Sequence, residues 1–260
     1  MCLIAFAWRA HPRWPLVLIA NRDELHARPS APAGFLADAS DVFGGIDLRA
    51  GGSWLLASGR RRLAAITNVR VGLSPEAAPR SRGELVKEFA ISDTSAQAFV
   101  TDMAPHAQDY GRFNLLLWDG QSLQCVGNHP QFHAEQVAPG LHALSNAALD
   151  TDWPKARRAK QALSLWLSQW TDAADVRVDV EPLFAALADT TPAADDELPD
   201  TGVGLDIERR LSPPFVVGDT YGTRCSTIVL AGCEGIEMTE RRFGANQVRE
   251  GEGRILACDP

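Results

Sequence analysis

The chain has 260 residues, 45% of them hydrophobic and 22% charged, which excludes fibrous and disordered classes of protein. A net charge of −8 without a basic stripe argues against a nucleic-acid partner. Apolar runs such as residues 16–20 are far shorter than the roughly 20 residues that a membrane-spanning helix needs.

The five cysteines predict free thiols and not a disulfide framework or a metal site. Their number is odd, and no two of them form a C-x-x-C pair. The first residues have neither the basic segment nor the cleavage site of a secretory signal peptide. We therefore expect reduced thiols, no bound metal and a cytoplasmic location.

The first half of the chain predicts hairpins with helices between them. Apolar runs at residues 2–8 and 16–20, joined by a Pro-containing link, are typical of a hairpin. The glycine-rich residues 44–52 match no phosphate-binding loop, so a turn and a tight strand entry are the simplest interpretation. The remaining elements are a hairpin of residues 53–57 and 63–67, helices over 81–91 and 94–103, and a hairpin of 114–118 and 123–126 around Asp119-Gly120.

The second half predicts a long helix, a surface loop and a last hairpin. The helix begins at Pro154, and its apolar residues recur every three or four positions as far as Trp170. The basic residues between 155 and 160 are expected on its solvated face. Residues 189–205 are acidic and rich in turn formers, which indicates a surface loop. Residues 227–231 and 237–243 predict the final hairpin.

Because strands come in hairpins with helices between them, the order differs from the βαβ alternation of a parallel sheet. We expect antiparallel sheets covered by helices, within a single domain spanning residues 1–260.

Cys2 is a candidate nucleophile because it directly follows the initiator methionine. Removal of the initiator methionine, which is common before a small residue, leaves a thiol and an α-amine on one residue. An α-amine has a pKa of about 7.7–8.0 and a cysteine thiol one of about 8.5. The amine could therefore accept the thiol proton and make Cys2 both base and nucleophile. By position alone, a small buried strand residue is the simpler interpretation.

The polar run Asn21-Arg22-Asp23-Glu24 follows the second predicted strand. Such a run can be a solvated turn. In a hairpin, however, this end of the second strand lies beside the start of the first, so Asp23 or Arg22 could approach Cys2. A carboxylate there would orient the α-amine, and a guanidinium would favour the thiolate.

Together these segments resemble the NRDE protein family, which is named for that tetrapeptide and has the transport-and-Golgi-organisation proteins as its eukaryotic branch. The resemblance begins with MCLIAF at the start and NRDE at 21–24. The other matching segments, in chain order, are GGIDL (44–48), GGSWL (51–55), TNVR (67–70), SRGEL (81–85), FNL (113–115), LSN (144–146), DWPK (152–155) and YGTR (221–224).

This resemblance implies a fold. The NRDE family is similar to the N-terminal nucleophile (Ntn) hydrolases, especially the choloylglycine hydrolase and penicillin acylase type. The implied fold is an α+β four-layer αββα sandwich, with two antiparallel sheets between helices.

The resemblance also implies a site. Cys2 would be the nucleophile, and Asp23 would hold its α-amine. Asn68 and Asn146 would donate hydrogen bonds to an oxyanion or a substrate carbonyl, each worth roughly 10²–10³ in rate. Arg224 would lie near the thiol.

Asn21 and Arg22 are the candidate substrate-binding residues. The sequence departs from the choloylglycine hydrolases at Ala20, where those enzymes have an arginine directly before the Asn-x-Asp pattern. Arg22 is the candidate for a related electrostatic role, although strand alternation could also direct it away from the pocket.

Two functions are compatible with these features. The first is Cys2-dependent hydrolysis or transfer of an acyl group from a small-molecule amide or thioester, which requires no cofactor. The second is a non-enzymatic protein that binds or carries haem, or handles acyl-CoA or lipid, in the same pocket. The chain has no C-x-x-C-H motif, but Cys2 or a histidine could ligate haem as cargo. A trafficking adaptor is a third, weaker hypothesis.

Overall fold

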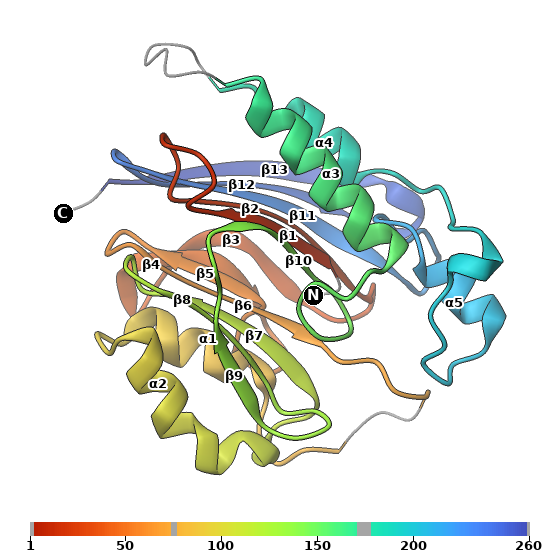
Figure 1. Ribbon diagram of the computed structural model, residues 1–260, viewed down its shortest axis with the longest axis horizontal. Helices are drawn as coiled ribbons and strands as arrows, with labels where there is room; N and C mark the ends of the chain where they lie inside the picture. Colours follow the sequence, from red (N-terminus) through yellow and green to blue (C-terminus); the bar gives the residue numbers. More distant parts are fainter. Residues whose placement is uncertain (1–2, 74–76, 171–177, 259–260) are drawn as a thin grey trace.

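The computed structural model describes residues 3–73, 77–170 and 178–258, and within them two antiparallel sheets lie face to face (Figure 1). The first sheet has the strand order β10-β1-β2-β11-β12-β13, and the second has β3-β4-β5-β6-β7-β8-β9. The strands of the first sheet are β1 (Leu3–Trp8), β2 (Leu16–Leu25), β10 (Gly140–Leu144), β11 (Tyr221–Gly232), β12 (Gly235–Phe243) and β13 (Arg249–Ala257). Those of the second are β3 (Ser30–Leu36), β4 (Ala39–Asp47), β5 (Leu55–Ser58), β6 (Arg62–Asn68), β7 (Phe113–Trp118), β8 (Leu123–Gly127) and β9 (His133–Gln136).

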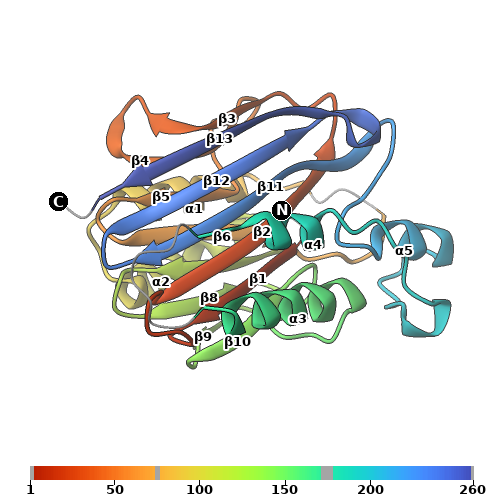
Figure 2. The same cartoon turned by 90° about the horizontal axis from the view of Figure 1, so that it is seen from above.

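Helices cover the outer faces of both sheets. Helices α3 (Pro154–Ser168) and α4 (Glu181–Leu187) lie on the first sheet, as Figure 2 shows from above. Helices α1 (Arg82–Ile91) and α2 (Ala96–Met103) lie on the second. The short helix α5 (Leu205–Leu211) lies at one end of the molecule. The expected α+β four-layer sandwich is therefore confirmed.

Strand alternation separates three buried apolar layers. In β1, Ile4, Phe6 and Trp8 belong to the layer between the sheets, whereas Leu3 and Ala5 pack toward α3 and α4. Because both faces of β1 are buried, its sequence reads as an unbroken apolar run. A third layer joins the second sheet to α1 and α2.

The glycine-rich segment forms part of a strand and not only a turn. Residues 44 and 45 lie within β4, and the ring of Trp54 lies against Gly45. A β-carbon on Gly45 would be 2.2 Å from the Trp54 ring, so only glycine allows this approach. The close packing places Trp54 in the buried layer between the sheets, where Arg22 stacks on its ring.

The other predicted helices and hairpins overlap helices and strands of the structure. The predicted surface loop of residues 189–205 contains the short 3₁₀ turn Asp195–Glu197, and helix α5 begins at its last residue, Leu205. No helix among the described residues is long and apolar enough to cross a membrane.

Candidate active site

The NRDE tetrapeptide lies inside β2 and not after it, because the strand continues to Leu25. Its neighbours are β1, where Leu3 pairs with Asn21, and β11, where Thr223 pairs with Asp23. Cys2 lies outside the described residues. Segments 200 positions apart in the sequence are thus brought together at one end of the first sheet.

Asp23 is buried and held by β11. Its Oδ1 accepts a hydrogen bond of 2.6 Å from the Thr223 hydroxyl, which in turn accepts one of 2.9 Å from the Val216 N–H. The pairing of β2 and β11 shifts register between Thr223 and Cys225, a β-bulge that locally changes which side chains face the partner strand. The result is a carboxylate of fixed orientation.

Asp23, Asn68 and Asn146 line one cavity of about 570 Å³. Asn68 ends β6, so the cavity has walls from both sheets. The structure therefore brings together three of the side chains that the resemblance assigns to the site.

Asn146 joins these walls. Its side-chain amide donates to the Asn68 main-chain carbonyl at 2.9 Å, and its main-chain carbonyl accepts from the Arg70 N–H at 2.9 Å. The Lys155 ammonium donates to Asn146 Oδ1 at 3.3 Å. Because an amide group has two hydrogens, this arrangement leaves one for a ligand.

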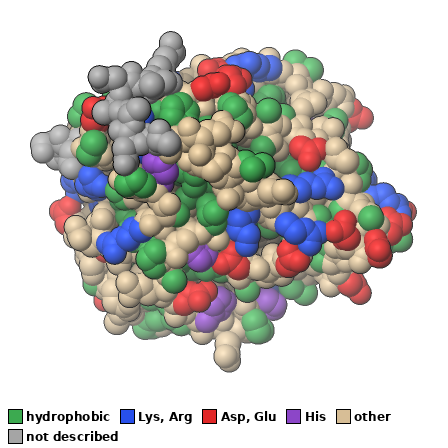
Figure 3. Space-filling model, turned by 45° about the horizontal axis from the view of Figure 1, so that its top comes forward, with side chains coloured by type: hydrophobic (Ala, Val, Ile, Leu, Met, Phe, Trp, Pro, Cys, Tyr) green, Lys and Arg blue, Asp and Glu red, His purple; other side chains and the backbone are tan. Residues whose placement is uncertain are grey.

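Lys155 corrects the expectation of a solvated basic face on α3. Its side chain is 3% exposed and lines the cavity, with its ammonium 5.9 Å from the Trp153 ring. By contrast, the side chain of Arg157, two positions later, is 46% exposed. On the face of the molecule in Figure 3, Lys and Arg side chains are interspersed with Asp and Glu.

Three arginines that sequence reasoning missed also line the cavity: Arg70, Arg82 and Arg112. Arg70 pairs with the buried Glu208 at 2.5 Å and donates to the Thr201 hydroxyl at 3.0 Å. Arg70 and Lys155 fall within the TNVR and DWPK segments that carry the family resemblance. Those segments were the available signal for them.

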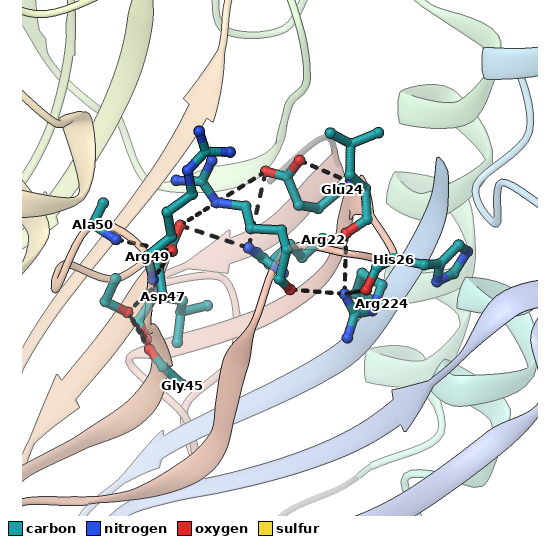
Figure 4. A network of polar contacts seen from close by, with 12 residues as sticks. Arg22, Glu24, His26, Gly45, Asp47, Arg49, Ala50 and Arg224 are labelled. Atoms are coloured by element: carbon teal, nitrogen blue, oxygen red, sulfur yellow. Dashed lines mark hydrogen bonds and ion pairs between the residues drawn. The ribbon is translucent and has the colours of Figure 1, made fainter. Parts of the chain in front are cut away.

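Arg22 lies in the layer between the sheets, not in the wall of the cavity. Its guanidinium stacks on Trp54 at 4.2 Å and lies 3.9 Å from both Glu24 and Asp47. Figure 4 shows Arg22 between these two carboxylates. The side chain is 4% exposed, and its Nη1 has no hydrogen-bond partner among the described residues.

Asn21 also lies outside the cavity and is completely buried. Its amide donates to the carbonyls of Leu187 and Pro214, both at 2.8 Å, and its Oδ1 accepts from the Ser226 hydroxyl at 2.6 Å. These contacts attach the end of α4 and the segment before β11 to β2. They occupy the whole amide group, which suits a structural role.

Arg224, at the bulge, holds main-chain carbonyls. Its Nη1 donates to those of Leu25, His26 and Arg28 at 3.0–3.1 Å, and its Nε donates to that of Phe243 at 3.3 Å. Figure 4 shows Arg224 directed at the chain around His26. Its side chain lines a separate space of about 30 Å³ and not the larger cavity.

Groups around that small space are shielded from water. Burial raises the pKa of the Cys225 thiol, and the nearby Glu240 carboxylate raises it further. Burial likewise raises the pKa of Glu240, whose carboxylate accepts the Ala33 N–H at 2.8 Å. The Cys225 thiol is therefore protonated at neutral pH and unsuited to nucleophilic attack.

Comparisons with known proteins agree with this architecture. A family model described as Transport and Golgi organisation 2 matches residues 1–245. The human Transport and Golgi organization protein 2 homolog is 33% identical over 263 residues, covering 93% of this chain and 92% of that protein. The Drosophila melanogaster Transport and Golgi organization protein 2 is 26% identical, covering 90% of this chain and 89% of that protein.

Among solved structures, the Caenorhabditis elegans ortholog of N-acylethanolamine-hydrolyzing acid amidase is similar to this chain with a TM-score of 0.50. The two are 8% identical, and the match covers 88% of this chain and 92% of the other. At that identity the likeness concerns the fold alone, which is that of an Ntn hydrolase. The sequence resemblance is confirmed, and the chain belongs to the Transport and Golgi organisation 2 family.

Proposed function

We propose that this protein cleaves or transfers the acyl group of a small-molecule amide or thioester, with Cys2 as its nucleophile. The observation that carries the proposal is the buried Asp23 carboxylate, fixed by Thr223 in the wall of a cavity that also contains Asn68 and Asn146. Cys2 directly precedes Leu3, and Leu3 pairs with Asn21 two positions before Asp23. Chain connectivity thus supports a short distance between residue 2 and this carboxylate.

The chemistry needs only residues of the chain and water, or an acceptor amine in place of water. With Met1 removed, the α-amine of Cys2 takes the thiol proton and the sulfur attacks the substrate carbonyl. Asp23 stabilises the resulting ammonium, while the side-chain amides of Asn68 and Asn146 donate to the oxyanion. The ammonium then protonates the leaving nitrogen or sulfur as its bond to carbon breaks. Water, or an acceptor amine, releases the acyl group from Cys2 and restores the thiol.

The test is a covalent adduct. Protein purified from its native host is measured by intact mass, then incubated with a panel of acyl amides and acyl thioesters. We expect the mass of the chain without Met1, and an added acyl group that maps to Cys2 and is absent in Cys2→Ala. The matched control is Cys233→Ala, because Cys233 is also a cysteine but lies exposed in the β11–β12 turn.

Two results would overturn the proposal. If Met1 is retained in the native host, the amine cannot act as the base. If no acyl group reaches Cys2 with any substrate of the panel, hydrolysis is wrong. Saturable one-to-one haem binding in that same protein, lost in Cys2→Ala, would then favour the carrier hypothesis.

A further inference from the structure

The side-chain amide of Asn146 has one acceptor among the residues that the structure describes. Its nitrogen donates to the main-chain carbonyl of Asn68 at 2.9 Å, and its second N–H is left for the cavity that Asn146 lines. A donor to an oxyanion must be aimed at one point before the charge develops there. The contacts on the oxygen side of the amide therefore decide how well Asn146 can act as such a donor.

Two donors lie on the oxygen side of this amide. The Lys155 ammonium donates to Asn146 Oδ1 at 3.3 Å, and the Ser145 hydroxyl lies 3.5 Å from the same atom. An ammonium can only donate, whereas the Asn68 carbonyl on the opposite side can only accept. Lys155 and Asn68 therefore specify the same orientation of the amide. The flipped orientation would set donor against donor and acceptor against acceptor.

Lys155 lies in a place that disfavours a charge. It belongs to the first turn of α3, where the helix dipole destabilises a cation, and it is 3% exposed. By contrast, the side chain of Lys160 on the same helix is 39% exposed and lies 3.6 Å from Asp150. A methionine at position 155 would fill a similar volume without the cost of burying a charge. The ammonium therefore indicates a contact that needs a cationic donor.

The charge of Lys155 also strengthens the amide as a donor. A cation on the oxygen of an amide draws electron density from the nitrogen, so hydrogen bonds from its N–H groups become stronger. The burial of Lys155 limits the screening of this effect by water. Through Asn146 the ammonium can thus stabilise an oxyanion without contacting the substrate. This role depends only on the direction of the hydrogen bond, whatever else the ammonium contacts.

We infer that Lys155 is a positioning residue, which fixes and polarises the Asn146 amide so that its second N–H is held toward the oxyanion. The inference rests on the proposed function, because the oxyanion forms in the acyl transfer assigned to the same cavity. Lys155 takes no proton and forms no bond in the reaction. Because its effect passes through Asn146, removal of Asn146 should also remove the effect of Lys155.

The first measurement needs no turnover. The full chain with Cys2→Ala is labelled with ¹⁵N-asparagine, and the Asn146 side-chain signal is identified by NMR as the one missing in Asn146→Asp. Lys155→Met should move this signal, whereas Lys160→Met, on the exposed face of the same helix, should leave it in place. Lys155→Arg, which keeps a cationic donor, should move it less than Lys155→Met does. Thermal unfolding shows that each variant is folded, and Lys155→Gln takes the place of a methionine variant that is not.

The second measurement is a double-mutant cycle with the substrate that acylates Cys2. Lys155→Met should lower kcat about tenfold, the cost of one charged hydrogen bond, and change KM by less than about twofold. Asn146→Ala should lower kcat by roughly 10²–10³. Since Lys155 acts through Asn146, the double variant should be no slower than Asn146→Ala alone. If the two losses multiply in the double variant, Lys155 acts by another route and the inference is wrong.

The outcomes separate the two proposals. An Asn146 signal that does not move in Lys155→Met overturns the inference, whether or not the native protein is acylated. A signal that moves, in a protein whose native form is acylated by no substrate, supports the positioning of this amide and contradicts the proposed hydrolysis. Acylation of Cys2 with multiplied losses in the cycle supports the hydrolysis and overturns the inference.

Discussion

Asn21 offers a sharp test, because its place in the NRDE motif suggested substrate binding whereas its contacts indicate a structural role. Asn21→Ala removes three hydrogen bonds and leaves two carbonyls and one hydroxyl buried without partners. Each lost bond to a neutral group costs about 0.5–1.5 kcal/mol, and each stranded buried group costs up to about 3 kcal/mol. We therefore expect a loss of about 3–5 kcal/mol in the free energy of unfolding.

The assay is urea unfolding followed by tryptophan fluorescence, with thermal unfolding alongside. For a chain of this size, such a loss lowers the melting temperature by about 10 °C. Ser226→Ala is the matched control, because it removes only one of the three bonds and should cost about 1 kcal/mol. A fully stable Asn21→Ala protein in which Cys2 is no longer acylated would refute this reasoning and would support a role for Asn21 in substrate binding.

Three further predictions concern the site and the frame that holds it. Thr223→Val removes the hydrogen bond to Asp23 and should lower kcat/KM about tenfold, with Thr223→Ser restoring it; an unchanged rate would contradict the role of this bond. Burial raises the pKa of Asp119, but three main-chain N–H bonds outweigh it and hold that pKa below its usual value. Its stabilisation is therefore present at neutral pH and is lost as the pH falls through the folded pKa. Asp119→Asn should destabilise the protein at pH 7, and this cost should shrink in denaturant titrations as the pH is lowered below about 3.9, the ordinary pKa of an aspartate. Burial raises the pKa of Cys125 to about 12 and also raises that of Cys225. Iodoacetamide should therefore label neither thiol in the native protein before denaturant is added, as measured by mass spectrometry.

Local sequence patterns predicted the elements in which buried and exposed side chains recur at regular intervals. The helix from Pro154 and the hairpin at Asp119-Gly120 follow from periodicity and turn chemistry that adjacent residues supply. Strand β13 (Arg249–Ala257) was missed because it is an exposed edge strand with charged residues along most of its length. Strand β3 (Ser30–Leu36) was missed because Pro32 and Gly34 read as a turn, although an edge strand accepts them.

The site residues that the sequence predicted are those that lie in segments resembling the family. The family resemblance grouped Asp23, Asn68 and Asn146, which line one cavity. Periodicity assigned Lys155 to solvent because a helical pattern contains no information about which segment covers its first turn. Asn146 contacts Lys155 in that turn, and Arg70 contacts Asn146; both are tertiary contacts. The main-chain contacts of Arg224 likewise depend on a bulge that the sequence does not signal.

The pairing of β2 with β11 has a consequence for biosynthesis. Strand β2 ends at Leu25 and its partner begins at Tyr221, so the ribosome makes most of the chain before β2 gains its second neighbour. At about 5–20 residues per second, that wait lasts about 10–40 s. During it, an apolar strand keeps an open edge, the kind of template on which chains aggregate. A nascent chain halted just before β11 should therefore bind a holdase chaperone until the last hairpin emerges.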